Sequence, residues 1–195
     1  GHLLLVDYGE RGVVSLLRPT RGGPEVRLGG GEARGLSDDA QWVLLETSAS
    51  GVSGLALTPV GTGSPVSLRL GTLGDFGPRT FHVDGLRVGF TAAEPGHPAR
   101  SFWVEPPDAA PRAVTPEGVT AVPGLLDGER VLGLATDGSV ALYSLRGGPP
   151  QRLSWRFPLN RWWFEALCLS RDGRFVYIRD GGVPARVDRI EISTG

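Results

Sequence analysis

Four similar segments recur along this chain at nearly constant spacing. They are LSDDAQWVLL (36–45), HVDGLRVGF (82–90), LLDGERVLGL (125–134) and LSRDGRFVYI (169–178). Aligned on their turns, they share aspartates at steps of 45, 43 and 45 residues, and these are Asp39, Asp84, Asp127 and Asp172. A repeat of this length constrains the fold strongly, because each unit is a small element that must bury its apolar surface against the next one.

Each segment has the pattern of a β-hairpin. Glycine follows the aspartate in three copies, and Ala40 replaces it in the first. Asp-Gly between apolar runs is typical of a hairpin turn, because glycine accepts a positive φ. A dense apolar run follows each turn, at 42–45, 88–90, 131–134 and 175–178. These runs do not alternate strictly, so we expect strands that are buried on both faces by neighbouring sheets.

A second hairpin follows the first in each complete repeat. It begins at Val52, Ser101 and Ser139, and it consists of an apolar strand, a Gly/Pro/Asp turn and a short outer strand. Four antiparallel strands in roughly 40–45 residues are the content of one propeller blade. The sequence therefore predicts an all-β fold: a partial β-propeller of four-stranded antiparallel blades, with three whole blades and two partial ones.

The whole blades are expected at 33–72, 79–119 and 120–157, with partial blades at 3–30 and 164–195, all in one propeller segment, 3–195. Because the first partial blade lacks its innermost strand and the last lacks its outermost, we expect a piece of a larger ring. Gly1-His2 is interpreted as the remnant of a purification tag. Unpaired edges and apolar faces at the terminal blades predict self-association, as a dimer or a partly open arc.

Composition narrows the classes of partner. The formal net charge is −1, and the arginines are spread among 21 acidic residues without a basic stripe, which disfavours nucleic acid. No stretch approaches the roughly 18 apolar residues that cross a bilayer, so direct membrane insertion is not expected. Cys168 is the single cysteine, and its alternating context EALCLS predicts a buried small side chain rather than a reactive thiol.

The segments LSDDAQWVLL and LSRDGRFVYI resemble the LSPDGKWVAF signature of TolB-type, WD40-like propeller repeats. The Gly-His and Trp-Asp pattern of true WD40 repeats is missing, which favours the TolB-like branch. The segments LLRPTRGGPEVRL and VPARVDRIEISTG also look like propellers attached to bacterial serine/threonine protein kinases. That resemblance implies a sensor or interaction domain, and TolB-like rings often have six blades. No kinase motif is present in the sequence.

Catalytic and metal-binding patterns are not found in the sequence. It has no Gly-x-Ser-x-Gly elbow, no zinc spacing and no calcium loop, so we expect no catalytic residues, no metal and no cofactor. His82 lies in an innermost strand, where it either lines the central channel or is packed and satisfied. The glycine-rich segment RLGGGEARG is not expected to bind phosphate. Its glycines precede a strand, whereas a phosphate-binding loop needs a helix N-terminus.

Loops on one rim of the propeller are the expected binding surface. The segment WRFPLNRWWFE (155–165) joins an outer strand to the next inner strand, and 71–80 and 92–100 reach the same rim. Aromatic and arginine side chains anchor interfaces, and loops on a rigid ring carry binding. The alternative is that Trp162 and Trp163 pack between blades. The candidate residues for a ligand or partner are Asp75, Phe76, Glu94, His97, Arg161 and Trp162.

These observations favour a non-catalytic scaffold that binds a protein or a small molecule on the rim or in the channel mouth. We expect the sensor or interaction region of a larger bacterial signalling protein, on the extracytoplasmic side of a membrane-anchored parent. One alternative is the substrate-gating propeller of a serine-peptidase-like hydrolase. Another is a stand-alone partner of an envelope complex.

Overall fold

The computed structural model describes residues 1–9, 12–49, 52–74, 76, 82–106, 109–157, 164–170, 172–180 and 184–193. These residues form strands and turns, and the described part of the chain contains no helix. It therefore holds no helix that is long and apolar enough to cross a membrane.

Eighteen strands follow one another along the described chain. They are β1 (His2–Gly9), β2 (Gly12–Pro19), β3 (Val26–Gly30), β4 (Glu32–Leu36), β5 (Trp42–Ala49), β6 (Val52–Pro59), β7 (Val66–Ser67), β8 (His82–Asp84), β9 (Arg87–Ala92), β10 (Arg100–Val104), β11 (Arg112–Ala113), β12 (Val119–Ala121), β13 (Arg130–Ala135), β14 (Ser139–Ser144), β15 (Gln151–Arg156), β16 (Phe164–Leu169), β17 (Phe175–Asp180) and β18 (Val187–Glu191).

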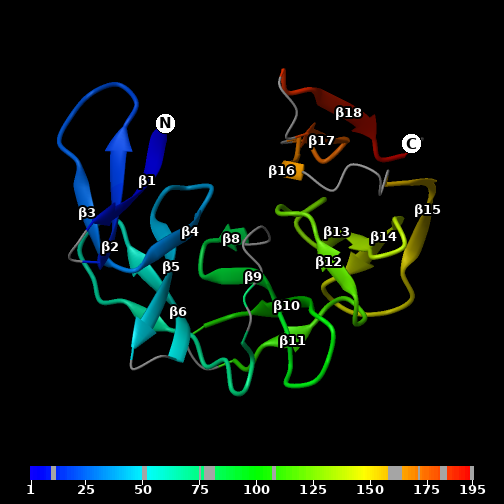
Figure 1. Ribbon diagram of the computed structural model, residues 1–195, viewed down its shortest axis with the longest axis horizontal. Helices are drawn as coiled ribbons and strands as arrows, with labels where there is room; N and C mark the ends of the chain where they lie inside the picture. Colours follow the sequence, from blue (N-terminus) through cyan, green and yellow to red (C-terminus); the bar gives the residue numbers. More distant parts are fainter. Residues whose placement is uncertain are drawn as a thin grey trace. The chain divides into compact units, whose positions relative to one another are not determined.

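The strands form five sheets in which neighbours along the chain are also neighbours in space (Figure 1). The sheets β4–β7, β8–β11 and β12–β15 have four strands each, and β1–β3 and β16–β18 have three. The predicted all-β organisation of three whole and two partial antiparallel units is therefore confirmed. The apolar runs predicted after the four turns lie in β5, β9, β13 and β17.

The chain divides into two compact units. One unit comprises Gly1–Thr72, Phe81–Val88 and Val104–Pro111, and the other comprises Leu73–Thr80, Gly89–Trp103 and Arg112–Gly195. In the first unit, Leu17 and Leu28 of the β1–β3 sheet pack against Val43 and Leu45 of β5.

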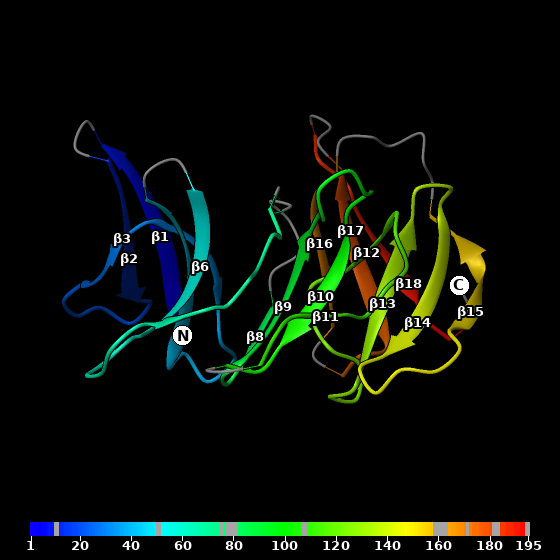
Figure 2. The ribbon, with the colours of Figure 1, turned by 90° about the horizontal axis from the view of Figure 1, so that it is seen from below.

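The core of the second unit lies on both faces of the β12–β15 sheet. On one face, Leu132 and Leu142 belong to a buried cluster with Val176 and Ile178 of β17, and Figure 2 shows these two sheets next to each other. On the opposite face, Val131 packs with Trp103 and Leu145. Strands apolar on both faces are thus buried by sheets on both sides, as the sequence predicts.

A serine and an aspartate build the turn in the first copy of the repeat. The Ser37 hydroxyl donates to Asp39 Oδ1 at 2.5 Å and accepts from the Trp42 amide at 2.9 Å, while the Gln41 amide donates to Asp39 Oδ1 at 3.0 Å. In the fourth copy, Ser170 and Asp172 make the equivalent bonds. The shared Leu-Ser-x-Asp pattern is therefore a hydrogen-bonded scaffold for the turn.

The second and third copies have no serine two residues before the aspartate, and an arginine takes over. Arg87 forms an ion pair with Asp84, and Arg130 lies 2.7 Å from Asp127, in both cases three residues after the aspartate. The turn aspartate is therefore held by a serine hydroxyl in the first and fourth copies and by an arginine in the second and third.

Buried hydroxyls hold the connections between sheets. In the first unit, the fully buried Ser15 donates to the Gly31 carbonyl at 2.9 Å and accepts from the Ala33 amide at 2.9 Å. In the second unit, the Ala121 amide donates to Ser101 Oγ at 2.7 Å, and the Ser101 amide donates to Thr115 Oγ1 at 2.8 Å. These bonds satisfy backbone groups that leave the regular ladders as the chain crosses to the next sheet.

The interpretation of Cys168 as a buried residue is wrong, because its side chain is exposed. Cys168 pairs with Tyr177 in the β16–β18 sheet, while the next residue, Leu169, packs against the buried cluster on the other face. Successive side chains of a strand point to opposite faces. Alternation in the sequence is the same for both faces, so it could not tell which of them is covered.

Ala40 occupies a backbone conformation that suits glycine, with φ of 56°, close to the 58° of Gly85 in the next copy. The left-handed region costs a non-glycine residue about 1–2 kcal/mol, and the extra freedom of glycine in the unfolded chain offsets part of the gain. We expect Ala40→Gly to raise the free energy of unfolding by about 0.5–1 kcal/mol in urea denaturation.

Gly85→Ala is the reciprocal control, because a Cβ there would meet no atom within 4 Å and only the backbone conformation opposes it. It should lower the free energy of unfolding by a similar amount. If both substitutions changed stability in the same direction, the strain argument would fail.

The Ser37 hydroxyl, followed by the Gln41 amide, holds the pKa of Asp39 below its ordinary value. Ser37→Ala should raise this pKa, which an NMR titration of the carboxylate measures directly. A lowered folded-state pKa stabilises the fold above the unfolded pKa, and this contribution is lost as pH falls through the folded pKa. The stability difference between the wild type and the variant should therefore shrink in acid. Ser67→Ala, at an exposed serine of β7, should leave the titration of Asp39 unchanged.

Candidate functional site

An irregularity between β14 and β15 opens the outer part of the β12–β15 sheet. Ser139 pairs with Arg156 and Ala141 with Arg152, so residues 153–155 of β15 all lie opposite Val140. A bulge of this kind bends the longer strand away from its partner and re-aims its side chains. It places polar side chains of β15 around a hollow rather than in a flat ladder.

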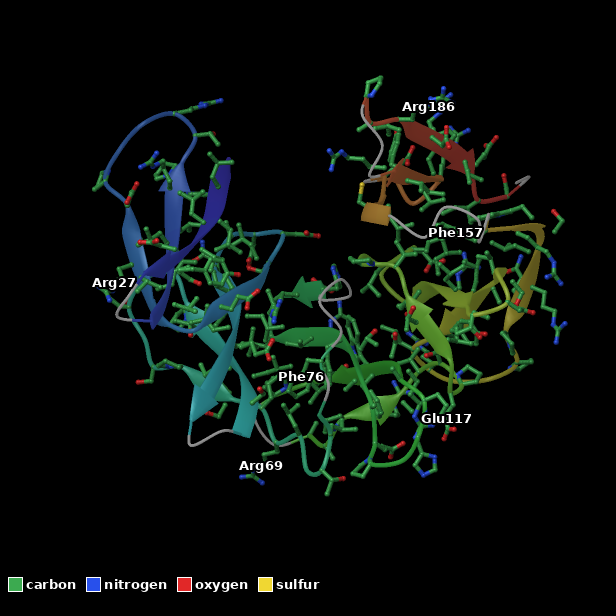
Figure 3. The ribbon with its side chains drawn as sticks, viewed as in Figure 1. Arg27, Arg69, Phe76, Glu117, Phe157 and Arg186 are labelled. Atoms are coloured by element: carbon green, nitrogen blue, oxygen red, sulfur yellow. The ribbon has the colours of Figure 1, made fainter. Side chains whose placement is uncertain are left out.

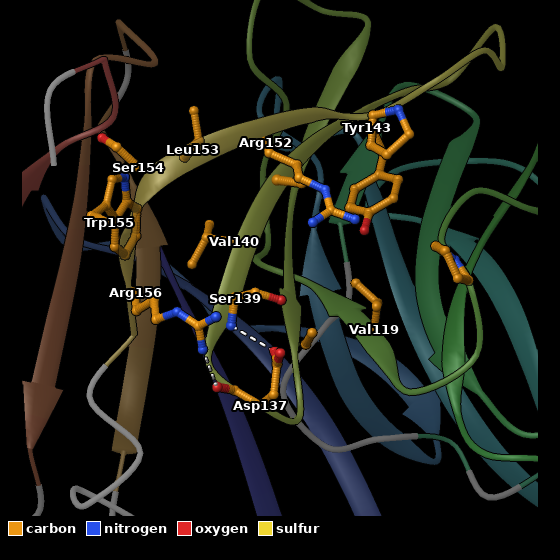
Figure 4. Close-up of a pocket in the computed structure, with 14 residues that line it drawn as sticks. Val119, Asp137, Ser139, Val140, Tyr143, Arg152, Leu153, Ser154, Trp155 and Arg156 are labelled. Atoms are coloured by element: carbon orange, nitrogen blue, oxygen red, sulfur yellow. Dashed lines mark hydrogen bonds between the residues drawn. The ribbon is translucent and has the colours of Figure 1, made fainter.

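The hollow is a pocket of about 380 Å³ within the second unit (Figure 4). It is lined by Pro116, Val119, Ala135, Asp137, Ser139, Val140, Ala141, Tyr143, Pro150, Arg152, Leu153, Ser154, Trp155 and Arg156. Its volume is near the lower end of the range for ligand sites, roughly 300–1,000 Å³. It therefore suits a group the size of one or two side chains.

One edge of the pocket carries a pair of opposite charges. The Ser139 amide donates to Asp137 Oδ1 at 2.8 Å, and the Arg156 guanidinium donates to the Asp137 backbone carbonyl at 3.3 Å. Hydrogen bonds from Ser139, with a smaller contribution from the charge of Arg156, hold the pKa of Asp137 below its ordinary value. Asp137 is thus ionised at neutral pH and offsets the charge of Arg156.

Arg152 and Tyr143 face each other across the pocket. Arg152 is exposed and Tyr143 is half-buried, and Figure 4 shows the guanidinium extending toward the phenol hydroxyl. Burial raises the pKa of Tyr143, while the charge of Arg152 opposes this shift. The phenol therefore keeps its proton at neutral pH and can donate a hydrogen bond beside a positive charge.

A glycine in the neighbouring strand sets the position of the Tyr143 ring. A Cβ on Gly133 would lie 2.7 Å from Cδ2 of Tyr143 and 3.0 Å from Cγ1 of Val119, which is closer than such carbons approach. The ring also packs against the cluster of Trp103, Val131 and Leu145. Gly133 therefore allows the Tyr143 ring, which forms one wall of the pocket, to lie directly against β13.

A second hollow, of about 300 Å³, lies where the β12–β15 and β16–β18 sheets meet. Its arginines already have carboxylate partners, since Arg130 pairs with Asp127 and Arg174 lies 3.2 Å from Glu191. These arginines are already compensated and offer little to an anionic ligand.

Comparisons with known proteins show what this arrangement is similar to. No known family model matches the sequence, and no curated protein sequence matches it. Among solved structures, TolB from Acinetobacter baumannii has a TM-score of 0.72 at 17% identity, covering 100% of this chain and 51% of that one. A TolB candidate from Agrobacterium tumefaciens has a TM-score of 0.62 at 16% identity, and the match covers 87% of this chain and 62% of that one.

A puromycin-hydrolysing peptidase from Mycobacterium tuberculosis is also similar, with a TM-score of 0.54 at 14% identity, covering 96% of this chain and 36% of that chain. This chain thus spans about half the length of the Acinetobacter TolB and about a third of the peptidase. The chain has a TolB-like β-propeller fold. The partial propeller predicted from the repeat is thereby confirmed, whereas the resemblance to kinase-attached propellers stays a prediction.

Within this TolB-like fold, two predicted binding residues come together. Glu94 forms an ion pair with Arg100, and the His97 amide donates to the Glu94 carbonyl at 3.0 Å. The imidazole Nδ1 of His97 lies 3.0 Å from Glu117, which directly follows Pro116 of the pocket. The charged cluster of Glu94, His97 and Glu117 is therefore linked to the pocket through Glu117, the sequence neighbour of Pro116.

The other predicted binding residues are placed differently or not described. The side chain of Phe76 is 9% exposed and meets Phe90 edge-on at 6.1 Å, within the core of the second unit (Figure 3). Asp75, Arg161 and Trp162 lie outside the described residues. The binding role of all six residues stays a prediction. Of the aromatic segment 155–165, Trp155 lines the pocket and Phe157 is buried.

His82 lies half-buried in β8, where burial lowers the pKa of the imidazole and favours the neutral ring. Within the described ranges, no three histidine, cysteine, aspartate or glutamate side chains gather as metal ligands would. The pocket, rather than His82, is therefore the candidate site.

Tyr143 and Arg152 are site residues that the sequence patterns do not single out. Both fall in ordinary strand patterns, SVALYS and QRLSWR, and the residue types do not reveal that Arg152 pairs with Ala141, two residues before Tyr143. The one sequence signal near them is Gly133 inside an apolar strand, because a glycine there indicates a close approach of other atoms.

We expect Gly133→Ala to displace the Tyr143 ring and to destabilise the fold by roughly 1–3 kcal/mol, the usual cost of overpacking. Urea denaturation of the double variant Gly133→Ala/Tyr143→Ala tests the cause. When two residues are in contact, the changes in the free energy of unfolding caused by their substitutions do not add. The cost of Gly133→Ala should fall markedly when Tyr143 is already alanine. Equal costs in both backgrounds would mean that the ring is not held against Gly133.

Proposed function

We propose that this chain is a non-catalytic, protein-binding β-propeller scaffold and the sensor or interaction region of a larger bacterial signalling protein. The observation that carries the proposal is the pocket formed by the β14–β15 bulge on a rigid sheet. It combines a tyrosine, a tryptophan and two arginines with apolar walls. Tyrosine, tryptophan and arginine are the residues that dominate binding energies at protein interfaces.

The shape of the pocket favours part of a protein over a large cofactor. A volume of about 380 Å³ accepts one or two side chains. In this proposal the pocket anchors a partner whose remaining contacts lie on nearby loops, among them the turn of Glu94 and His97. The other rim candidates, Asp75, Phe76, Arg161 and Trp162, belong to the same proposal, and so does the extracytoplasmic location.

A second candidate is the substrate-gating propeller of a serine-peptidase-like hydrolase. The similarity to the Mycobacterium tuberculosis peptidase favours it. The coding sequence around this segment discriminates between the two. A kinase domain with a membrane helix supports the sensor, and a domain with a Gly-x-Ser-x-Gly elbow supports the hydrolase.

Photo-crosslinking in the native host tests the binding function. The pocket residue Pro150 is exposed, and p-benzoylphenylalanine in its place should capture a specific protein that mass spectrometry identifies. The same probe at Arg21, an exposed turn residue of the first unit, is the matched control. We expect capture at Pro150 alone, and Tyr143→Ala should weaken binding of the purified partner by about tenfold or more. Identical capture at both positions would argue against a binding surface at the pocket.

A further inference from the structure

The geometry points to a more specific role for the pocket: it binds a carboxylate that a partner protein presents next to an apolar side chain. This inference rests on the protein-binding function proposed above and names the chemistry that the pocket recognises. Arg152 is the central residue, with Tyr143 as a second donor and the apolar lining as the seat of the adjacent side chain.

The charges of the lining leave one guanidinium uncompensated. Among the fourteen lining residues, Arg152 and Arg156 are basic and Asp137 alone is acidic. Asp137 lies beside Arg156, so Arg152 has no carboxylate partner among the residues that line the pocket. Elsewhere in the described second unit, two exposed arginines do have acidic partners: Arg146 pairs with Glu129, and Arg174 pairs with Glu191. The pocket therefore carries one net positive charge.

Arg152 and Tyr143 together suit the two oxygens of a carboxylate. A guanidinium offers parallel N–H donors whose spacing matches a carboxylate, and such charge-assisted bonds are stronger than neutral ones. The Tyr143 hydroxyl, which stays protonated, faces the same space (Figure 4). An incoming carboxylate between the two groups would accept from both.

The lining next to Arg152 is apolar. Val119, Val140 and Leu153 line the pocket, and Pro116 and Pro150 lie at its edge with exposed rings. A carboxylate alone would leave these apolar surfaces exposed to water, whereas an apolar or aromatic side chain next to the carboxylate would bury them. The two proline rings have almost no rotamer freedom to lose when a ligand covers them.

The same charges favour a carboxylate over a phosphate. A phosphate monoester carries close to two negative charges at neutral pH, and the pocket supplies one uncompensated positive charge together with the nearby carboxylate of Asp137. A monoanion is therefore the better match. The carboxylate could come from a chain terminus or from an acidic side chain, and the probes below separate these two sources.

The test uses the 195-residue chain and small probes in a ¹H–¹⁵N NMR titration. The probes are N-acetyl-phenylalanine, its amide, N-acetyl-glutamyl-phenylalanine amide and phenyl phosphate. Dissociation constants on the order of millimolar are expected for ligands of this size. The signals to follow are the Arg152 Nε–H and the amides of Ser139 and Ser154. We expect shifts with a carboxylate probe and none with N-acetyl-phenylalanine amide, which lacks the carboxylate.

Either carboxylate source supports the inference. Stronger binding of N-acetyl-phenylalanine indicates a chain terminus, and stronger binding of the glutamyl probe indicates an acidic side chain. Arg152→Gln should weaken binding of the better probe by about tenfold or more, since it removes the charged donor pair. Arg146→Gln makes the same change of charge at an exposed arginine outside the lining and should have little effect.

Three results would overturn the inference: no shift with either carboxylate probe, equal shifts with the amide, or tighter binding of phenyl phosphate than of both carboxylates. A thermal melt of Arg152→Gln confirms that the variant is folded. If the partner captured at Pro150 binds Arg152→Gln as tightly as the wild type, carboxylate recognition fails while the protein-binding function stands.

Discussion

The fold depends on strands that must be buried on both faces at once. Adjacent residues of β13 show the constraint: Val131 packs on one side of its sheet with Trp103, and Leu132 packs on the other side with Val176 and Ile178. A single four-stranded sheet cannot hide both faces, so each sheet needs a neighbour on either side. The apolar run after each turn supplies the residues that cover both faces of a strand. The consecutive sheets of a propeller bury these residues between them.

The turns show how one repeat tolerates different residues. Each copy keeps an aspartate at the turn, but the group that orders the carboxylate changes from Ser37 and Ser170 to Arg87 and Arg130. Either partner binds the carboxylate and holds it in the turn. What the fold needs is a carboxylate held in the turn, and that need can be met by a neutral donor from before the turn or by a charged donor from after it.

The fold was predictable from the sequence because periodicity and turn chemistry report directly on local structure. The apolar runs of β5, β9, β13 and β17 and their Asp-Gly turns mark the strands and their order. The site was not predictable in the same way. Arg152 lies opposite Ala141, two residues before Tyr143 on β14, and the bulge at 153–155 follows before Trp155 and Arg156 join the lining. Neither this pairing nor the bulge is visible in the residue pattern of QRLSWR. Cys168 was misplaced for a related reason: alternation separates two faces without saying which one a neighbour covers.

The pocket forms in the outermost strand because that strand has the most freedom. β13 pairs along both sides and packs on both faces, so an added residue there would disturb two ladders and two cores. β15 pairs only with β14 among the described strands, so its extra residues bend it outward at the cost of a few ladder bonds. The rigid side of the pocket is then supplied by β13 and β14, where Gly133 holds the place of the Tyr143 ring. A repeated scaffold thus leaves its outer edges open to variation, and the chemistry of recognition can change there while the buried strands stay as they are.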